Sequence, residues 1–194
     1  MTLREEKAAL RAQYLATRRS ISPQVHEKIS HAVCDRFLAL ASYRYSEHIL
    51  LYAPLSGELD IMPIAREALL AGKSVWFPRC DTARRSMTFH RVTDLESQLH
   101  IGAYGIREPD ASLPVYNTDF CSSVCIVPAI LFDRKGYRLG YGKGYYDRFL
   151  PEFRGTSIGA AASDFILHSL PHGRFDRTVD ILLTEKGVNL LHAI

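Results

Sequence analysis

The first 40 residues carry their apolar positions at helical spacing. Over residues 1–15 these positions are Leu3, Leu10, Tyr14 and Leu15, which predicts an amphipathic helix. Ser22 followed by Pro23 is typical of a helix start, because serine accepts a hydrogen bond from the first turn and proline lacks the amide hydrogen left unpaired there. A second helix is expected to run from there to about residue 40. The chain is therefore predicted to open with a helical hairpin over residues 1–40.

From residue 48 onward the pattern alternates between strand-like and helix-like segments. Residues 48–54 read as a buried strand, residues 62–72 as a short helix ended by Gly72, and residues 74–80 as another strand. This order is typical of a βαβ unit. Further strands are predicted at residues 87–92, 123–132, 156–163 and 179–185, with a helix at residues 144–153.

These elements predict an α/β fold with a mostly parallel sheet, because strands and helices alternate along the chain. Residues 123–132 form the strongest buried-strand run, whereas residues 94–119 have weak periodicity. No repeat or linker divides the sequence, so a single domain over residues 1–194 is expected. With 47% apolar residues, a chain of this length needs no metal or disulfide to hold its core.

Cysteine usage and the lack of a membrane segment indicate an intracellular protein. The irregular spacing of Cys34, Cys80, Cys121 and Cys125 fits neither a structural zinc site nor a disulfide framework, so reduced thiols are expected. The longest apolar stretch, residues 124–132, is well below the roughly 18 residues that span a bilayer. The first 20 residues resemble neither a secretory signal nor an acid-poor transit peptide. A cytoplasmic protein without membrane partners is predicted.

The net charge favours small anions over nucleic acids as ligands. A formal charge of +3 falls short of the basic field of a typical nucleic-acid binder. The most informative segment, residues 138–147, places three glycines and the cations Arg138 and Lys143 between a buried strand and a helix. Glycines let backbone N–H groups converge on a phosphate, and a helix N-terminus adds positive potential. The spacing matches neither G-x-G-x-x-G nor a Walker A loop, and an ordinary glycine-rich turn is the alternative.

Residues 127–150, VPAILFDRKGYRLGYGKGYYDRFL, closely resemble the hallmark segment of the 5-formyltetrahydrofolate cyclo-ligase family, also called methenyltetrahydrofolate synthetases. Further similar segments occur in the family's order: KAALRAQYLATRRSIS, YAPLSGELD, GIREP and LPHGRFDRTVDILLTE. The resemblance implies an ATP- and Mg²⁺-dependent enzyme that converts 5-formyltetrahydrofolate to 5,10-methenyltetrahydrofolate, releasing ADP and phosphate. It also implies a three-layer α/β/α sandwich related to the ribose-phosphate isomerase and CoA-transferase group.

The resemblance assigns ATP binding to two segments. Lys7 and Arg11 match the family's N-terminal basic pair, and their spacing of four places both on one helical face. A solvated helix face is the alternative for this pair, and it is the interpretation favoured for Arg18 and Arg19. The other ATP-binding residues expected from the resemblance are Arg138, Leu139, Gly140, Tyr141, Gly142, Lys143, Gly144, Tyr145 and Tyr146.

The resemblance also assigns residues to the folate and to the chemistry. Glu58 matches a substrate-contacting glutamate, Ala53 a position in the pterin pocket, and Tyr104 an aromatic against the substrate. The glycine-rich loop is shared with the folate through Tyr141, Gly142, Lys143, Gly144 and Tyr145. Arg138 and Lys143 are the expected catalytic cations. Lys143 departs from the pattern GYGGGYYD common in bacterial relatives, where glycine stands at this position.

Two carboxylates match the family's Mg²⁺ ligands, Asp147 and Asp176. Asp180 is a rival for the second position, and Asp147 could instead compensate the dipole of its own helix. A monomer is expected, with a dimer left open. Two other classes of function remain: a sugar-phosphate isomerase or acyl-CoA transferase of the same fold group, and a non-enzymatic RNA-binding module.

Overall fold

The computed structural model describes residues 1–117 and 122–191. Its centre is a seven-stranded sheet in the order β12-β11-β9-β6-β1-β2-β3. The strands are β1 (His48–Leu50), β2 (Ser74–Asp81), β3 (Ser86–Val92), β6 (Ser123–Val127), β9 (Thr156–Ala160), β11 (Ile181–Thr184) and β12 (Gly187–Leu190). The five central strands are parallel, and the edge strands β3 and β12 pair antiparallel. The predicted mostly parallel sheet is confirmed.

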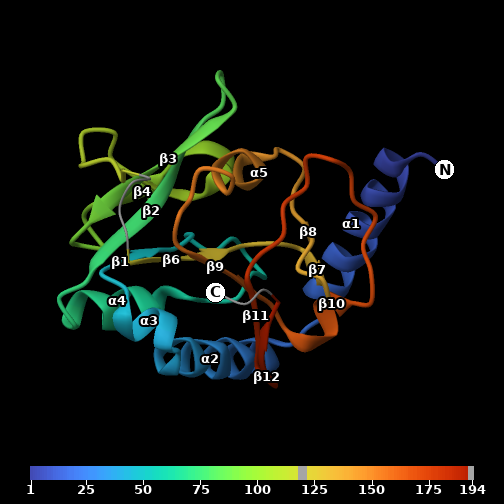
Figure 1. The fold of residues 1–194 in the computed structure, drawn as a ribbon, viewed down its shortest axis with the longest axis horizontal. Helices are drawn as coiled ribbons and strands as arrows, with labels where there is room; N and C mark the ends of the chain where they lie inside the picture. Colours follow the sequence, from blue (N-terminus) through green and yellow to red (C-terminus); the bar gives the residue numbers. More distant parts are fainter. Residues whose placement is uncertain (118–121, 192–194) are drawn as a thin grey trace.

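Three helices cover one face of this sheet and lie below it in Figure 1: α2 (Pro23–Ala39), α3 (Ala41–Tyr45) and α4 (Met62–Leu70). Their apolar side chains, among them Phe37 and Ile64, share a buried core with Val75 and other strand residues. The βαβ unit predicted from the sequence forms as β1, α4 and β2, with β1 and β2 parallel. This layer packs against one face of the sheet, and the cavity described below lies on the opposite face.

The opposite face is covered by mixed elements, and α5 lies above the sheet in Figure 1. These elements are α1 (Leu3–Arg19), α5 (Tyr145–Phe149), η2 (Ser163–Phe165) and a small sheet of β10 (Ile166–Leu167), β7 (Leu131–Asp133) and β8 (Arg138–Leu139). Their side chains build a second buried core with Leu50, Trp76 and Cys125 of the central sheet. The fold thus has three layers, but the second outer layer is only partly helical.

Two predicted elements differ because of local backbone chemistry. Residues 123–132 form two strands in different sheets, because Pro128 has no amide hydrogen for the ladder and the chain leaves the central sheet there. The helix predicted at residues 144–153 is limited to the five residues of α5. The antiparallel strand β12 was missing from the sequence-based prediction.

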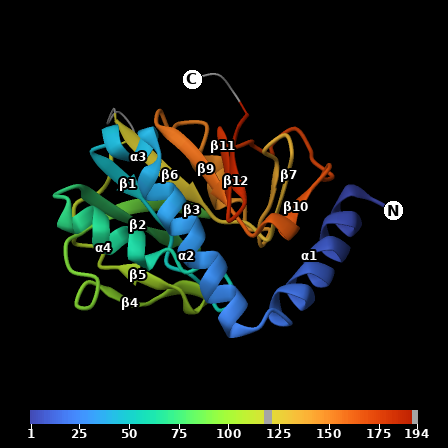
Figure 2. The ribbon, with the colours of Figure 1, turned by 90° about the horizontal axis from the view of Figure 1, so that it is seen from below.

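Both N-terminal helices form, but they diverge from the connecting loop and do not make a packed hairpin (Figure 2). The buried residues of α2 join the core on one face of the sheet. Leu10, Tyr14 and Leu15 of α1 pack against the core on the other face. The two predicted helices are confirmed. The periodicity of the sequence does not specify which surface the apolar face of each helix packs against.

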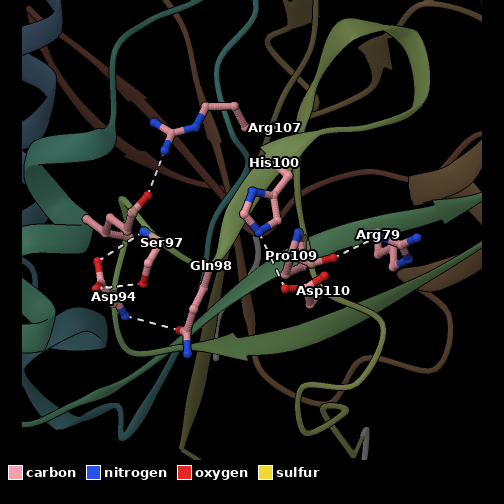
Figure 3. A network of polar contacts seen from close by, with 9 residues as sticks. Arg79, Asp94, Ser97, Gln98, His100, Arg107, Pro109 and Asp110 are labelled. Carbon is pink, nitrogen blue, oxygen red and sulfur yellow. Dashed lines mark hydrogen bonds and ion pairs between the residues drawn. The ribbon is translucent and has the colours of Figure 1, made fainter.

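The weakly periodic segment holds a two-stranded sheet, β4 (Leu99–Ile101) and β5 (Arg107–Pro109), joined by the short helix η1 (Ala103–Gly105). Polar contacts fix this unit (Figure 3): the Arg107 guanidinium donates to the Leu95 carbonyl at 2.7 Å, and Arg79 of β2 donates to the Pro109 carbonyl at 2.8 Å. Backbone pairing at only three positions explains the weak periodicity. The unit presents η1 to the site described below.

Two further expectations concern thiols and membranes. Cys34, Cys80 and Cys125 are free thiols, as predicted, and Cys121 lies outside the described residues. Over residues 1–117 and 122–191, no helix combines the length and the apolar character needed to cross a bilayer.

Candidate active site

A cavity of about 650 Å³ lies between α1, the end of β1, η1, β5 and the glycine-rich loop before α5. Every site residue predicted from the sequence lines it: Lys7, Arg11, Ala53, Glu58, Tyr104, Arg138, Leu139, Gly140, Tyr141, Gly142, Lys143, Gly144, Tyr145, Tyr146, Asp147 and Asp176. These residues come from separate segments of the chain. The structure therefore brings together side chains that the sequence analysis linked only through resemblance.

The glycine-rich loop owes its shape to two glycines in the left-handed region. Gly142 has φ +88° and Gly144 has φ +71°, backbone angles that side chains rarely adopt. Lys143 between them is not among the described residues with positive φ, so lysine is accommodated there without backbone strain. The Arg11 guanidinium donates from Nε to the Gly140 carbonyl at 2.8 Å. Helix α1 thus braces the loop directly.

Asp176 is paired with Lys7, and the charges of Arg138 and Arg11 also interact with it. The Lys7 ammonium lies 2.6 Å from Asp176 Oδ2, and the Gly173 N–H donates to the same oxygen. Burial raises the pKa of Asp176, but these two hydrogen bonds and the charges of Lys7 and Arg138 outweigh it, so the pKa lies below its ordinary value. Burial lowers the pKa of Arg11, and the charge of Asp176 opposes that shift. Asp176 therefore gathers positive charge into the cavity.

Arg138 is a buried cation on β8, with Nη2 2.9 Å from Asp147 Oδ1. Its guanidinium lies 5.4 Å from the centre of the Tyr146 ring, within cation–π range. The Arg138 Nε and the Tyr146 hydroxyl are both buried and have no hydrogen-bond partner among the described residues. Buried donors of this kind are normally paired. Arg138 and Tyr146 both line the cavity, so these two buried atoms lie within its wall, below the surface that a ligand would touch.

Glu58 is a buried carboxylate in the loop after β1, and its Oε2 accepts from the Leu55 N–H at 2.9 Å. Burial raises the pKa of Glu58, and the Leu55 hydrogen bond, the charge of Arg18 and the Tyr141 hydroxyl partly offset the rise. Burial and the nearby Glu58 raise the pKa of Tyr141 to about 12. A carboxylate and a phenol thus stand together in the cavity wall.

Tyr104 reaches the glycine-rich loop from η1. Its backbone adopts φ +59°, which is uncommon for a residue with a side chain. The Tyr104 hydroxyl lies 3.3 Å from the Tyr145 hydroxyl, and the Lys143 ammonium lies 5.2 Å from the centre of the Tyr104 ring. The hydrogen bond with Tyr104 raises the pKa of Tyr145 to about 12. This cluster joins two loops that line the cavity.

Several lining residues were not predicted. The buried Glu108 accepts from the Cys80 N–H at 3.0 Å, and both line the cavity with the apolar residues Leu55, Pro78, Met87, Ile106 and Pro128. The motif GIREP pointed to the segment but not to its carboxylate. The solvated interpretation of Arg18 is wrong: its Nη2 donates to the Ala129 and Ile130 carbonyls at 2.8 and 3.1 Å. Arg19 is exposed, as expected.

Asp180 does not line this cavity. Its Oδ2 accepts from the Ser157 N–H at 2.8 Å and from the Ser157 hydroxyl at 2.6 Å, at a separate surface depression. Among the residues that the structure describes, no group of three or more His, Cys, Asp or Glu side chains is placed to hold a metal ion. Of the two rivals, Asp176 therefore lines the cavity and Asp180 does not, and Asp147 and Asp176 are each paired there with a cation.

Comparison with known protein families identifies the family of this chain. The model of the 5-formyltetrahydrofolate cyclo-ligase family matches residues 3–185. This chain belongs to that family. The cyclo-ligase relatives include a probable 5-formyltetrahydrofolate cyclo-ligase of Caenorhabditis elegans, 27% identical with 94% of each chain covered. The 5-formyltetrahydrofolate cyclo-ligase of Escherichia coli K12 is 25% identical, with 88% of this chain and 96% of the relative covered.

Solved structures support the same cyclo-ligase family. The 5,10-methenyltetrahydrofolate synthetase of Aquifex aeolicus superposes with a TM-score of 0.84 and is 34% identical, covering 96% of this chain and 93% of that one. The synthetase of Mycoplasma pneumoniae has a TM-score of 0.75 at 21% identity, which speaks for the fold. The predicted α/β fold is confirmed, and the relation to the ribose-phosphate isomerase group stays a prediction.

Proposed function

We propose that this chain converts 5-formyltetrahydrofolate to 5,10-methenyltetrahydrofolate, using ATP and releasing ADP and phosphate. Family membership supports the reaction, because the curated relatives carry the cyclo-ligase name. The observation that carries the residue assignments is the convergence of cations, a glycine-rich loop and a buried carboxylate on one cavity. A phosphate donor and a folate need these groups together.

ATP phosphates are assigned to the cationic part of the lining. Lys7, Arg11 and Arg138 all line the cavity, and Arg11 also braces the loop at Gly140. The N–H groups of the loop add donors for phosphate oxygens, and the Arg138 guanidinium adds positive charge beside them. These groups hold and orient the nucleotide before reaction.

The reduced pterin is assigned to the wall that carries Glu58, Ala53 and Tyr104. The Glu58 carboxylate is an acceptor for ring N–H groups, and Tyr104 offers an aromatic face. The burial of Glu58 makes it selective for ligands that carry matching N–H groups. A ligand without them would leave buried carboxylate oxygen unpaired, which costs binding free energy. The apolar residues around Ile106 complete a surface suited to a ring system.

A divalent cation fits the carboxylates of Asp147 and Asp176. Their ion pairs with Arg138 and Lys7 engage one oxygen each, and Mg²⁺ takes only one or two protein carboxylates beside phosphates and water. We assign Asp147 and Asp176 to Mg²⁺ that arrives with ATP, and the ion would neutralise phosphate charge when bound. A dedicated protein cage is not required for that role.

The chemistry needs positioning and charge stabilisation more than covalent work. A formamide carbon is a poor electrophile, so transfer of the γ-phosphoryl group of ATP onto the formyl oxygen, with release of ADP, activates that carbon for attack by N10, after which phosphate leaves. Arg138 and Lys143 are placed to stabilise the negative charge that moves between the two substrates. Closing the ring then requires only that the folate be held with N10 near the formyl carbon.

The deciding experiment mixes the purified chain with 5-formyltetrahydrofolate, ATP and Mg²⁺ and follows the methenyl chromophore. Product is expected only when all three are present, with ADP formed in equal amount. Turnover of a sugar phosphate or a CoA ester without ATP would replace this proposal by the isomerase or transferase class. Salt-sensitive RNA binding with no ATP turnover would favour the RNA-binding class.

The remaining expectations about the whole protein stay predictions. These are a single domain over residues 1–194, a monomer, a cytoplasmic location, and no nucleic-acid or membrane partner. Free thiols at Cys34, Cys80 and Cys125 are compatible with a reducing compartment. Sedimentation of the purified chain at several concentrations tests the monomer.

A further inference from the structure

Arg18 lies behind the folate wall of the cavity. Its Nη2 is shared by the carbonyls of Ala129 and Ile130, and its guanidinium carbon lies 5.4 Å from the centre of the Phe165 ring. Its stem packs so closely on Gly57 that a methyl group there would lie 3.4 Å from Arg18 Cγ and Cδ. Gly57 directly precedes Glu58. The last turns of α1 are thereby pressed against the loop that carries the proposed pterin acceptor.

A small void of about 20 Å³ separates these groups and is lined by Arg18, His26, Tyr52, Gly57 and Glu58, among others. Arg18 Nη1 is buried and has no hydrogen-bond partner among the residues described. An arginine that only anchored a helix would be satisfied by its two carbonyls or by solvent. Instead, Arg18 and Glu58 line the same void, and the charge of Arg18 lowers the pKa of both Glu58 and Tyr141 against the rise caused by burial.

We propose that Arg18 is a positioning residue that orients Glu58 and Tyr141 for the folate through its buried positive charge. The role toward the folate rests on the proposed function, whereas the contacts of Arg18 do not depend on it. The charge of Arg18 lowers the pKa of Glu58 against the rise caused by burial, so the carboxylate stays available as an acceptor. Because the same helix holds Lys7 and Arg11 at the phosphates, docking of α1 prepares both halves of the site.

Other groups also face Glu58 and have to be counted. The His26 ring Nε2 lies 2.8 Å from the backbone carbonyl of Glu58, and the Tyr52 hydroxyl donates to the Leu59 carbonyl. The pKa of Tyr146 on α5 is raised mainly by burial, and the charge of Glu58 adds to the rise. Of the charged groups facing the carboxylate, Arg18 is the cation that lowers its pKa. Replacing Arg18 by a neutral residue should therefore raise the pKa of Glu58.

The test compares Arg18→Gln and Arg18→Lys with Arg19→Gln as the matched control, since Arg19 is the exposed neighbour on the same helix. The acidic limb of kcat/KM for 5-formyltetrahydrofolate is expected to move to higher pH in Arg18→Gln by about one unit, with KM raised roughly tenfold and kcat changed less. Arg18→Lys should restore most of the limb, because it keeps the charge. Arg19→Gln should match the wild type.

A second readout does not depend on activity. Carbon-13 NMR of the Glu58 carboxyl, identified by its loss in Glu58→Gln, gives its titration without substrate. A higher titration midpoint in Arg18→Gln supports the proposal even if the chain forms no methenyl product, which would refute only the proposed function. An unchanged midpoint and an unchanged KM overturn it. If Arg18→Gln does not fold, Arg18→Lys decides: a wild-type midpoint and KM, with the charge kept and the carbonyl fork lost, support the role of the charge, whereas a strongly raised KM with an unchanged midpoint would overturn it.

Discussion

The Lys7 ammonium lies 2.6 Å from the Asp176 carboxylate, although 169 positions separate the two residues. This ion pair ties α1 to the segment before β11, and both side chains line the cavity. It explains why α1 docks on the cavity face of the sheet while α2 packs behind it. The part of the cavity that we assign to ATP thus draws residues from both ends of the chain.

Asp176→Asn should weaken ATP use. The change keeps the size of the side chain but removes the charge that pairs with Lys7 and that we assign to the metal. The KM for ATP and the Mg²⁺ concentration for half-maximal rate should each rise, by roughly tenfold. Steady-state kinetics at varied Mg²⁺ measure both. Asp180→Asn is the control, because that carboxylate accepts from Ser157 away from the cavity; the opposite pattern would exchange the two assignments.

The same pair should contribute to stability in a defined pH range. The pKa of Asp176 is lowered on folding, so its stabilising effect is complete above the unfolded pKa and is lost as pH falls through the folded pKa. The stability difference between the wild type and Asp176→Asn should stay constant from about pH 7 to about pH 5 and shrink below about pH 4. Urea unfolding at these pH values measures it. A difference that grows on acidification would contradict the shift.

Arg11→Ala should reduce ATP binding while the fold survives. Arg11 Nε holds the Gly140 carbonyl, so the variant loses both a cation and a brace of the glycine-rich loop. Alanine is favourable in a helix, so the melting temperature should change little. ATP affinity by calorimetry should fall roughly tenfold, the expected loss for one charge-assisted contact. Arg4→Ala, an exposed change on the same helix, should bind ATP normally; equal losses in both variants would indicate a general effect of charge.

The resemblance to the family supplied the candidate site residues, whereas residue spacing indicated only their local geometry. The spacing of Lys7 and Arg11 and the glycines of the loop are local features, and local geometry alone places them on one face or in one turn. Which segments a helix face contacts depends on the tertiary fold and cannot be predicted from local spacing. Arg18 looked solvated because its neighbours are polar, yet the carbonyls of Ala129 and Ile130 reach it from a loop more than 100 positions away.

The β4–β5 unit shows the same limit for strands. Its strands are three residues long and partly exposed, too short to leave a periodic signal in residues 94–119. Pro128 is the opposite case, because its missing amide hydrogen is a local fact and should have divided the run at residues 123–132. The β4–β5 unit is too short to be predicted from periodicity, whereas the break at Pro128 follows from a local property of the proline backbone.

Gly144→Ala should impair the site beyond its cost in stability. Gly144 has φ +71°, caps α5, and an added methyl group would lie 2.8 Å from Arg148 Nη1. Gly72→Ala is a matched control, since Gly72 has φ +73° and open space around it. Both variants should lose about 1 kcal/mol of unfolding free energy, the usual cost of a left-handed alanine. Only Gly144→Ala should also raise the KM for ATP; equal kinetics in the two variants would exclude a role for the loop backbone.

Lys143 is expected to act on the transition state of phosphoryl transfer. It projects from a loop whose neighbouring glycines absorb the unusual backbone angles, so Lys143→Gly should fold normally. Its ammonium rests over the Tyr104 ring, near the wall assigned to the folate, and a cation there interacts most strongly when charge moves from ATP toward the formyl oxygen. We expect kcat to fall by about tenfold, or about 1.4 kcal/mol, with a smaller change in KM for 5-formyltetrahydrofolate.

Lys143→Met separates this electrostatic role from packing on Tyr104. Methionine keeps an apolar stem near the ring but has no charge, so it should lose as much kcat as the glycine variant if the ammonium acts on the reaction. If Lys143 only holds Tyr104 in place, Lys143→Met should retain activity while Lys143→Gly raises the folate KM. Wild-type kcat in both variants would exclude Lys143 from the reaction and leave stabilisation of the transferred charge to Arg138 and the loop amides.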